Sequence, residues 1–308
     1  PYTPLFRSPH IRNTIQRATS SLKVLKALAG TSWGFPKETL VHTLKAYTRP
    51  ILNYGAPLWH HVTSSSNLDK LCVVQNAALR IATGNTLMAA IPHLHAEAGT
   101  LPLKVYLELC GSQFYASALQ HSHPSHPIVS SPPIPRQMKA TLRSRHEGDL
   151  LRLLGPLADG SPPIILEGAL PEGSYPTARR RLRASAVAAT LTRRPANRVL
   201  LAPPPEVDPA ETLLSRAHRS TLSQLRSGHC SRLSSYRHRE GWEESPTCPE
   251  CGAADHTAAH LFNCPEFPTD LAPGDLWAAP LQVAQFLSGL PTFSQLPPLQ
   301  LDFTFQPP

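Results

Sequence analysis

Three cysteines and a histidine near the C-terminal end of the chain have the residue types and spacing of metal ligands. The stretch reads CPECGAADHTAAHLFNC, and Cys248 and Cys251 form a C-x2-C pair within it. Two thiolates at this spacing can bind one metal ion, and Gly252 allows the sharp turn that follows. His260 and Cys264 lie four residues apart, which on a helix would place them on the same face. The sequence therefore predicts a tetrahedral site of three cysteines and one histidine, whose soft ligands favour zinc.

His256 is the other candidate histidine in this stretch. The spacing C-x2-C-x4-H fits a retroviral-type knuckle up to His256, but seven residues then separate His256 from Cys264. A helical pair of His260 and Cys264 needs no special loop, so His260 is preferred and His256 stays open as the alternative. Four protein ligands leave no coordination position for water, which predicts a structural site. The segment HTAAH also lacks the glutamate of a zinc hydrolase.

An arginine-rich stretch precedes the cysteines. Residues 212–239 contain six arginines and no acidic residue, and Leu214, His218, Leu222 and Leu225 would share one face of a helix that ends at Gly228. Guanidinium groups match phosphate oxygens, so this stretch favours contact with nucleic acid over the alternative of solvated arginines on a packed helix. The predicted nucleic-acid-binding residues are Arg216, Arg219, Arg226, Arg232, Arg237 and Arg239.

The overall charge and cysteine content agree with an intracellular, nucleic-acid-binding protein. The formal net charge is +8 and the isoelectric point is about 9.4, which favours a polyanionic partner such as RNA or DNA, although a mildly basic protein without such a partner would look similar. Six cysteines in 308 residues are too few for a disulfide scaffold and fit the reducing nucleus or cytoplasm. No run of 18 apolar residues occurs, so we expect no membrane span.

The hydrophobic pattern predicts a mainly α fold. Apolar residues recur at helical spacing over 10–29, from Pro36 to about Gly55 with a bend at Pro50, from Ser66 to just before Gly84, and after Pro102. We therefore expect an all-helical region over residues 1–120.

The remaining chain divides by composition. Prolines, of which the chain has 34, cluster within 121–210 and predict a Pro- and Arg-rich, partly disordered linker. The run ARRRLR at 178–183 is treated there as a solvated charge run without a specific contact. An arginine-rich helix and a small zinc-stabilised domain should follow over 211–290, with a Pro-rich tail over 291–308. The aliphatic and aromatic residues expected to form the core beside the metal are Leu261, Phe262, Leu271, Leu276, Trp277 and Phe286.

No catalytic centre is identifiable in this chain. The sequence has no Walker-type glycine loop, no G-x-S-x-G elbow and no dinucleotide-binding glycine fingerprint, and its aspartates are scattered rather than paired as in two-metal polymerases. Site chemistry alone therefore indicates binding and leaves enzymatic activity undecided.

Two long stretches resemble one family. LKVLKALAGTSWGFPKETLVHTLKAYTRPILNYGAPLW (22–59), LCVVQNAALRIATG (71–84) and IPHLHAEAGTLPLKVYLEL (91–109) resemble the segment after the palm in reverse transcriptases of jockey-type non-LTR retrotransposons. Residues 201–236 and 248–277 resemble the C-terminal end of the same polyproteins, in the same order along the chain. The resemblance covers roughly two-thirds of the chain and is loose in the Pro-rich middle.

The resemblance implies a helical, thumb-like region that grips the primer–template duplex, followed by a cysteine-rich nucleic-acid-binding end. It implies that Cys248, Cys251, His260 and Cys264 are the zinc ligands, in agreement with their spacing. The family's palm, with its magnesium-binding aspartate pair, and its endonuclease have no counterpart here, so we do not expect this chain to polymerise DNA alone. The first residue is not Met, as expected of a fragment.

Two other interpretations remain open at this stage. The chain could be a stand-alone or domesticated zinc-binding module that contacts a protein partner, or a non-functional remnant of an element. The sequence does not decide between RNA and DNA, and it leaves protein partners, oligomeric state and the packing of the two ordered ends undetermined.

Overall fold

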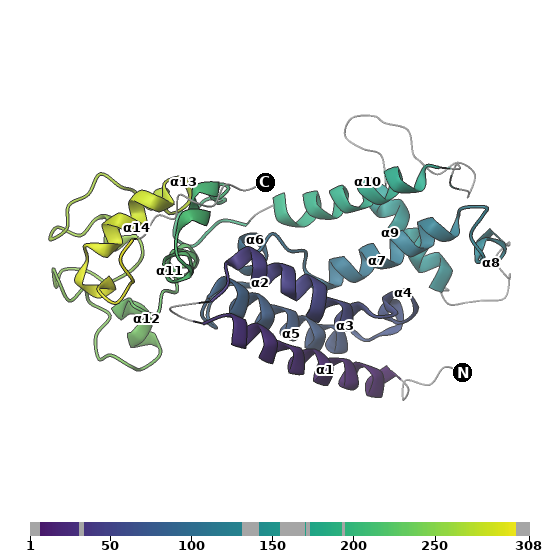
Figure 1. The fold of residues 1–308 in the computed structure, drawn as a ribbon, viewed down its shortest axis with the longest axis horizontal. Helices are drawn as coiled ribbons and strands as arrows, with labels where there is room; N and C mark the ends of the chain where they lie inside the picture. The colour runs from purple at the N-terminus through teal and green to yellow at the C-terminus, as the bar shows by residue number, and fades with distance from the viewer. Residues whose placement is uncertain are drawn as a thin grey trace. The chain divides into compact units, whose positions relative to one another are not determined.

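The fold is described from a computed structural model, which describes residues 7–30, 34–130, 142–154, 170, 173–192 and 195–299. These residues are mainly helical, and the predicted mainly α fold is confirmed (Figure 1). They contain no β-strand, only an isolated antiparallel bridge between Thr247 and Asp255. Over the same ranges, no helix combines the length and apolar character needed to cross a membrane.

The N-terminal part contains the predicted helices. The elements are α1 (Arg7–Leu28), α2 (Lys37–Thr43), η2 (Leu44–Thr48), α3 (Arg49–Asn53), α4 (Ala56–Trp59), η3 (His60–Val62), α5 (Ser65–Thr83), α6 (Ile91–Glu97) and α7 (Leu103–Ala118). The second predicted helix changes geometry before Pro50, not at it, because η2 is a π-helical segment of five residues that ends at Thr48. A proline cannot donate the backbone hydrogen bond of a helix, and a widened turn in front of it accommodates that loss.

Part of the segment predicted as a linker is helical. Between residues 121 and 210 lie α8 (His126–Ser130), α9 (Leu142–Leu154), α10 (Tyr175–Val187) and η4 (Ala188–Thr192), and η5 (Pro209–Leu213) begins there. Helix α10 buries Ala178, Leu182 and Ala186, one on each successive turn, in a core shared with Tyr115 and Leu150. The predicted disorder concerns stretches that include 131–141 and 155–169, which lie outside the described residues, as do residues 300–308 of the predicted tail.

The C-terminal part contains short elements. They are α11 (Arg216–Ser227), α12 (Ser234–Arg239), η6 (His260–Phe262), α13 (Asp275–Ala278), α14 (Pro280–Ser288) and η7 (Pro291–Phe293). The face predicted for α11 is buried, with exposed fractions of 8% or less at Leu214, His218, Leu222 and Leu225. The helix ends at Gly228 with a φ of 71°, a left-handed conformation that glycine adopts without strain.

The core expected beside the metal ligands is present. Leu261, Phe262, Leu276 and Trp277 are buried in one hydrophobic cluster, and Leu271 and Phe286 pack against it partly buried. The same cluster includes Leu222 and Leu225 from α11 and Val283 from α14. Burial of this apolar surface is the main stabilising contribution in the C-terminal part.

The chain forms two compact units that differ from the predicted domains. Unit 1 consists of Pro1–Ser20, Arg49–Gln75 and Leu101–Arg193, and unit 2 consists of Ser21–Thr48, Asn76–Thr100 and Arg194–Pro308. Two segments of the predicted 1–120 region therefore belong to the same unit as the cysteine-rich end. The boundary was predicted at residue 120 because the helical periodicity of the sequence continues to that point.

Buried charges connect the segments of unit 2. Lys37 Nζ lies 2.8 Å from Glu97 Oε1 and 3.2 Å from Glu211 Oε1, and Arg226, which has no exposed surface, donates to Glu211 and lies 3.4 Å from Glu97. Burial disfavours the Glu97 carboxylate, but Arg226 and Lys37 outweigh it and hold the pKa of Glu97 well below its ordinary value. Removing one partner would leave an uncompensated buried charge, so these segments depend on one another.

Candidate metal centre

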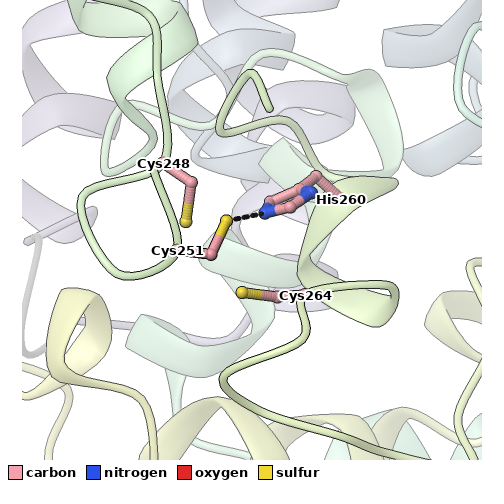
Figure 2. Close-up of side chains that lie close together, drawn as sticks. All are labelled: Cys248, Cys251, His260 and Cys264. Atoms are coloured by element: carbon pink, nitrogen blue, oxygen red, sulfur yellow. Dashed lines mark hydrogen bonds between the residues drawn. The ribbon is translucent and has the colours of Figure 1, made fainter. Parts of the chain in front are cut away.

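The four predicted ligands converge in unit 2. One ligand atom from each of Cys248, Cys251, His260 and Cys264 lies within 4.8 Å of the others. Figure 2 shows the three thiols and the imidazole pointing into the same space, with Cys251 Sγ 3.3 Å from His260 Nε2. Such a set of three sulfurs and one nitrogen can hold a metal ion.

The first two cysteines lie on a tight backbone turn. The Cys248 amide donates to the Ala254 carbonyl at 2.8 Å, and the Gly252 amide donates to the Cys248 carbonyl at 3.0 Å. Gly252 has a φ of 64°, which an L-residue rarely adopts. The Ala253 amide approaches Cys251 Sγ at 3.5 Å, so the backbone of the turn itself supports the thiolate.

The second pair of ligands is held differently from the prediction. His260 begins the short 3-10 turn η6, which ends at Phe262, and Asn263 leaves helical geometry with a φ of −128°. The two ligands are therefore not successive turns of an α-helix, which corrects the helical argument while leaving the two residues together. Between them, Leu261 and Phe262 are buried in the core, and this burial anchors the turn that carries His260.

His256, the alternative ligand, lies outside the four-residue cluster. Its side chain is 2% exposed, and its Nδ1 lies 3.3 Å from both the Ser234 amide and the Ser234 hydroxyl. Burial lowers the pKa of His256 to about 4, so the imidazole is neutral and accepts from the amide. His256 thus connects the turn of cysteines to the start of α12.

The thiols have different acidities. The hydrogen bond from the Ala253 amide lowers the pKa of Cys251, whereas desolvation by burial raises the pKa of Cys264. Metals bind the thiolate, and Cys251 loses its proton more readily than Cys264.

Three of the six predicted nucleic-acid-binding arginines are engaged inside unit 2. Arg226 is fully buried against Glu211, and a side chain without exposed surface cannot reach a phosphate, which corrects the prediction for that residue. Arg219, 5% exposed, donates to Glu38. Arg216 donates to the carbonyls of Gly30, Ile81 and Ala82. Helix periodicity placed these arginines on the flank of α11, but the acids and carbonyls that receive them come from distant parts of the chain.

The other three predicted arginines lie nearer the surface. Arg232 is half-buried, and Arg237 and Arg239 are exposed on α12. Arg237 Nη1 lies 2.9 Å from Glu243 Oε1, and Arg239 Nη1 lies 2.9 Å from His229 Nδ1. Trp242, which the sequence prediction missed, is 62% exposed just after this helix. The interleaving of arginines and an aromatic in YRHREGW (236–242) was the available signal.

A second basic surface lies on α10 in unit 1. Arg179, Arg180 and Arg183 are exposed, and Arg181 is half-buried. The 13 residues of α10 contain no acid, and none of these arginines forms an ion pair with a residue in the described part of the chain. The run was visible in the sequence, but only the buried face of the helix shows that the charges project from an ordered element.

Comparisons with known proteins identify no relative. No protein-family model, no curated protein and no solved structure matches the chain.

Proposed function

We propose that Cys248, Cys251, His260 and Cys264 hold a structural zinc ion. A tetrahedral zinc ion bound by thiolate and imidazole separates its ligand atoms by about 3.5–3.8 Å, and the four atoms found within 4.8 Å of one another are compatible with that spacing. Three soft sulfur ligands favour zinc over magnesium or calcium. When bound, zinc would supply a fixed cross-link and no catalysis, because four protein ligands close the coordination shell.

The cross-link would stabilise the small core of unit 2. The residues between His260 and Cys264 supply Leu261 and Phe262 to that core. The turn that carries Cys248 and Cys251 contributes few apolar side chains of its own. A zinc ion bound to both segments would therefore hold the Cys248–Cys251 turn against the core, to which the turn itself contributes little apolar surface.

We further propose that the chain binds nucleic acid through phosphate contacts, without reading base sequence. The observation that carries this proposal is the acid-free helix α10, which buries Ala178 and Leu182 on one face and exposes Arg179, Arg180 and Arg183 on the other. Guanidinium groups on a rigid element lose little entropy when they bind phosphates. Trp242, beside the exposed arginines of α12, would add stacking with an unpaired base.

This proposal agrees with the resemblance to the C-terminal region of jockey-type reverse transcriptases. In that setting the chain would be the nucleic-acid-gripping part of an RNA-directed DNA polymerase, with magnesium chemistry confined to a palm outside this chain. The corrected arginine assignment moves the proposed contacts from α11 to α10 and α12, and it leaves the class of partner unchanged.

The test is binding of fluorescently labelled single-stranded RNA and DNA to the full chain across a salt series. The variant Arg179→Gln/Arg180→Gln/Arg183→Gln removes the proposed contacts. Three phosphate contacts correspond to a change of about 2 in the slope of log affinity against log salt for single strands. The matched control is Arg12→Gln/Lys23→Gln/Lys26→Gln, which removes the same charge from exposed positions on α1.

The proposal expects the α10 variant to lose both affinity and salt slope while the α1 variant retains most of both. Equal losses in the two variants would assign binding to net charge alone. Absence of binding by the zinc-loaded wild-type chain at low salt would contradict a nucleic-acid function and favour a zinc-containing protein-interaction module.

A further inference from the structure

Three histidines and an aspartate of unit 1 converge on one buried point. One ring nitrogen from each of His60, His61 and His146 lies within 4.8 Å of the other two. His60 and His61 come from η3, and His146 and Asp149 come from α9. The exposed fractions of His60 and His146 are 5% and 4%. Imidazoles this close and this buried need a shared partner, because three such rings do not satisfy one another.

The side-chain atoms that face this point are poorly satisfied. His60 Nε2, His61 Nε2, His146 Nδ1 and Asp149 Oδ2 are buried and form no well-directed hydrogen bond with any described residue, although Asp149 Oδ2 lies 3.0 Å from His61 Nε2 and can pair with it when that nitrogen carries a proton. Leaving one buried polar atom unsatisfied costs about 1–3 kcal/mol, so His60 Nε2 and His146 Nδ1, which lie beside the His61–Asp149 pair without a hydrogen bond, favour a bound group at this point.

Backbone carbonyls fix which nitrogen carries the proton. His60 Nδ1 lies 2.9 Å from the Ala56 carbonyl, and His146 Nε2 lies 2.8 Å from the Pro57 carbonyl. A carbonyl only accepts, so each of these nitrogens is the protonated one in a neutral ring, and the opposite nitrogen keeps a lone pair. Those opposite nitrogens, His60 Nε2 and His146 Nδ1, are the two unpartnered ones. Metal-binding histidines are oriented by the same kind of hydrogen bond.

Asp149 brings a carboxylate to the same place. Its Oδ2 lies 3.0 Å from His61 Nε2 and 3.9 Å from His60 Nε2, while its Oδ1 lies 3.5 Å from Arg152 Nη2. Arg152 also pairs with Glu108 at 2.6 Å. This second ion pair fixes Arg152 in position beside Oδ1 of Asp149. The other oxygen, Oδ2, faces the imidazoles of His61 and His60.

Gly111 of α7 allows the rings to approach. A Cβ at this position would lie 2.8 Å from His146 Nδ1 and 2.8 Å from His60 Cε1. Any other residue would therefore push apart the two rings that supply the free lone pairs. The close packing against the helix is a specific feature of this site and not a loose gathering of surface histidines.

We propose that His60, His61, His146 and Asp149 form a second metal site, which binds a divalent transition ion such as Zn²⁺. Imidazole and carboxylate ligands suit zinc and its neighbours in the first transition row, and three nitrogens with one oxygen complete a four-coordinate shell. The ion would give bonds to His60 Nε2 and His146 Nδ1 and would take the place of the contact between His61 and Asp149. It would also tie α9 to the end of the α4–η3 segment within unit 1.

The experiment titrates metal-free full-length chain with Zn²⁺ in competition with a chromophoric chelator. Wild type is expected to take up two equivalents. His146→Gln and Asp149→Asn should each retain the cysteine-bound equivalent and weaken the other at least tenfold, since even residues that only orient metal ligands contribute 10–100-fold. The matched control is His42→Gln, an exposed histidine on α2, which should retain both equivalents.

Cobalt reports which atoms bind the ion, and the thiolate absorption that His146→Gln retains shows that its cysteine cluster is still folded. The Co²⁺ spectrum of wild type minus that of His146→Gln should show ligand-field bands of nitrogen and oxygen ligands without thiolate charge-transfer absorption. Uptake by wild type of a single equivalent with thiolate absorption would overturn the proposal. So would retention of both equivalents by Asp149→Asn and His146→Gln, or thiolate absorption in the difference spectrum.

Discussion

The cysteine cluster of unit 2 and the histidine cluster of unit 1 bring four potential metal ligands together by different means. All ligands of the first lie within 17 residues, Cys248 to Cys264, and two short turns position them. The second joins His60 and His61 to His146 and Asp149, and Gly111 of a third helix determines how closely the rings approach. The first geometry is therefore set by local backbone, and the second by tertiary packing.

The surroundings of the two clusters also differ. The cysteine turn between Pro246 and Asp255 has few apolar side chains, and a metal ion would be its main support. The histidine cluster lies where η3 meets α7 and α9, and α7 and α9 already share a hydrophobic core with α10. We therefore expect the first metal to be needed for local folding and the second to add stability to helices that pack without it.

The largest effect should come from removing a cysteine ligand. Cys251→Ser should abolish metal binding in unit 2 and destabilise it by several kcal/mol, since structural zinc contributes about 10–16 kcal/mol in zinc-finger peptides. Metal analysis and thermal unfolding measure both consequences, with Cys72→Ser, a cysteine outside both clusters, as the control. Full stability of the metal-free Cys251→Ser variant would contradict a structural role for the metal.

Breaking the buried charges of unit 2 should cost less than losing the cysteine site. Arg226→Leu leaves Glu211 and Glu97 buried without their guanidinium, and loss of one partner of a buried pair costs about 3–5 kcal/mol. Chemical denaturation measures the change, with Arg237→Leu as the control because the Arg237 pair is solvent-exposed. Equal effects in the two variants would mean that unit 2 does not depend on the long-range pairs.

A single methyl group tests the histidine cluster. Gly111→Ala should separate His60 from His146, weaken zinc binding in unit 1 and cost about 1–3 kcal/mol of overpacking, offset in part by the higher helix propensity of alanine. Gly148→Ala is the matched control, because a Cβ there has no atom within 4 Å and only the propensity gain remains. Zinc uptake at the cysteine cluster should be unaffected by either change.

The smallest effect concerns pH and a histidine outside both clusters. Burial, together with Arg198 and Arg239, lowers the pKa of His229 in unit 2 to about 4. The unfolded chain binds this proton near pH 6.5, so the stabilising contribution is complete above that pH and is lost as the pH falls toward 4. His229→Gln should reduce the loss of stability between pH 6.5 and 4, which thermal unfolding of both proteins across this pH range measures. An unchanged pH profile would show that another group is responsible.

The contrast between the clusters also explains how much the sequence could predict. The C-x2-C pair and its histidine were readable because a short turn converts spacing directly into geometry. The helices of α1, α5, α7 and α11 were readable because their apolar periodicity is strong. HHV and RHEGD contain no recognisable motif, since nothing along the chain indicates that α9 packs beside η3.

The arginines of α11 also show that sequence spacing does not reveal tertiary partners. Their spacing correctly indicated a helix flank, and Leu222 and Leu225 are indeed buried. Whether a flanking arginine meets solvent or a buried glutamate depends on the position of Glu211, Glu97 and Glu38. Those positions follow from tertiary structure. Charge composition alone therefore predicted phosphate contacts for arginines that pair with glutamates and carbonyls inside the protein.

The discontinuous construction of unit 2 has a consequence for biosynthesis. Lys37 pairs with Glu211, which follows it by 174 positions. At translation rates of about 5–20 residues per second, roughly 10–35 s pass between the synthesis of Lys37 and the synthesis of Glu211. During that interval segments 21–48 and 76–100 have left the ribosome, but the residues of 194–308 that cover their apolar faces and pair with their charges have not yet been synthesised. Nascent chains of this protein should therefore recruit chaperones early and reach their protected state only after α11 has been synthesised.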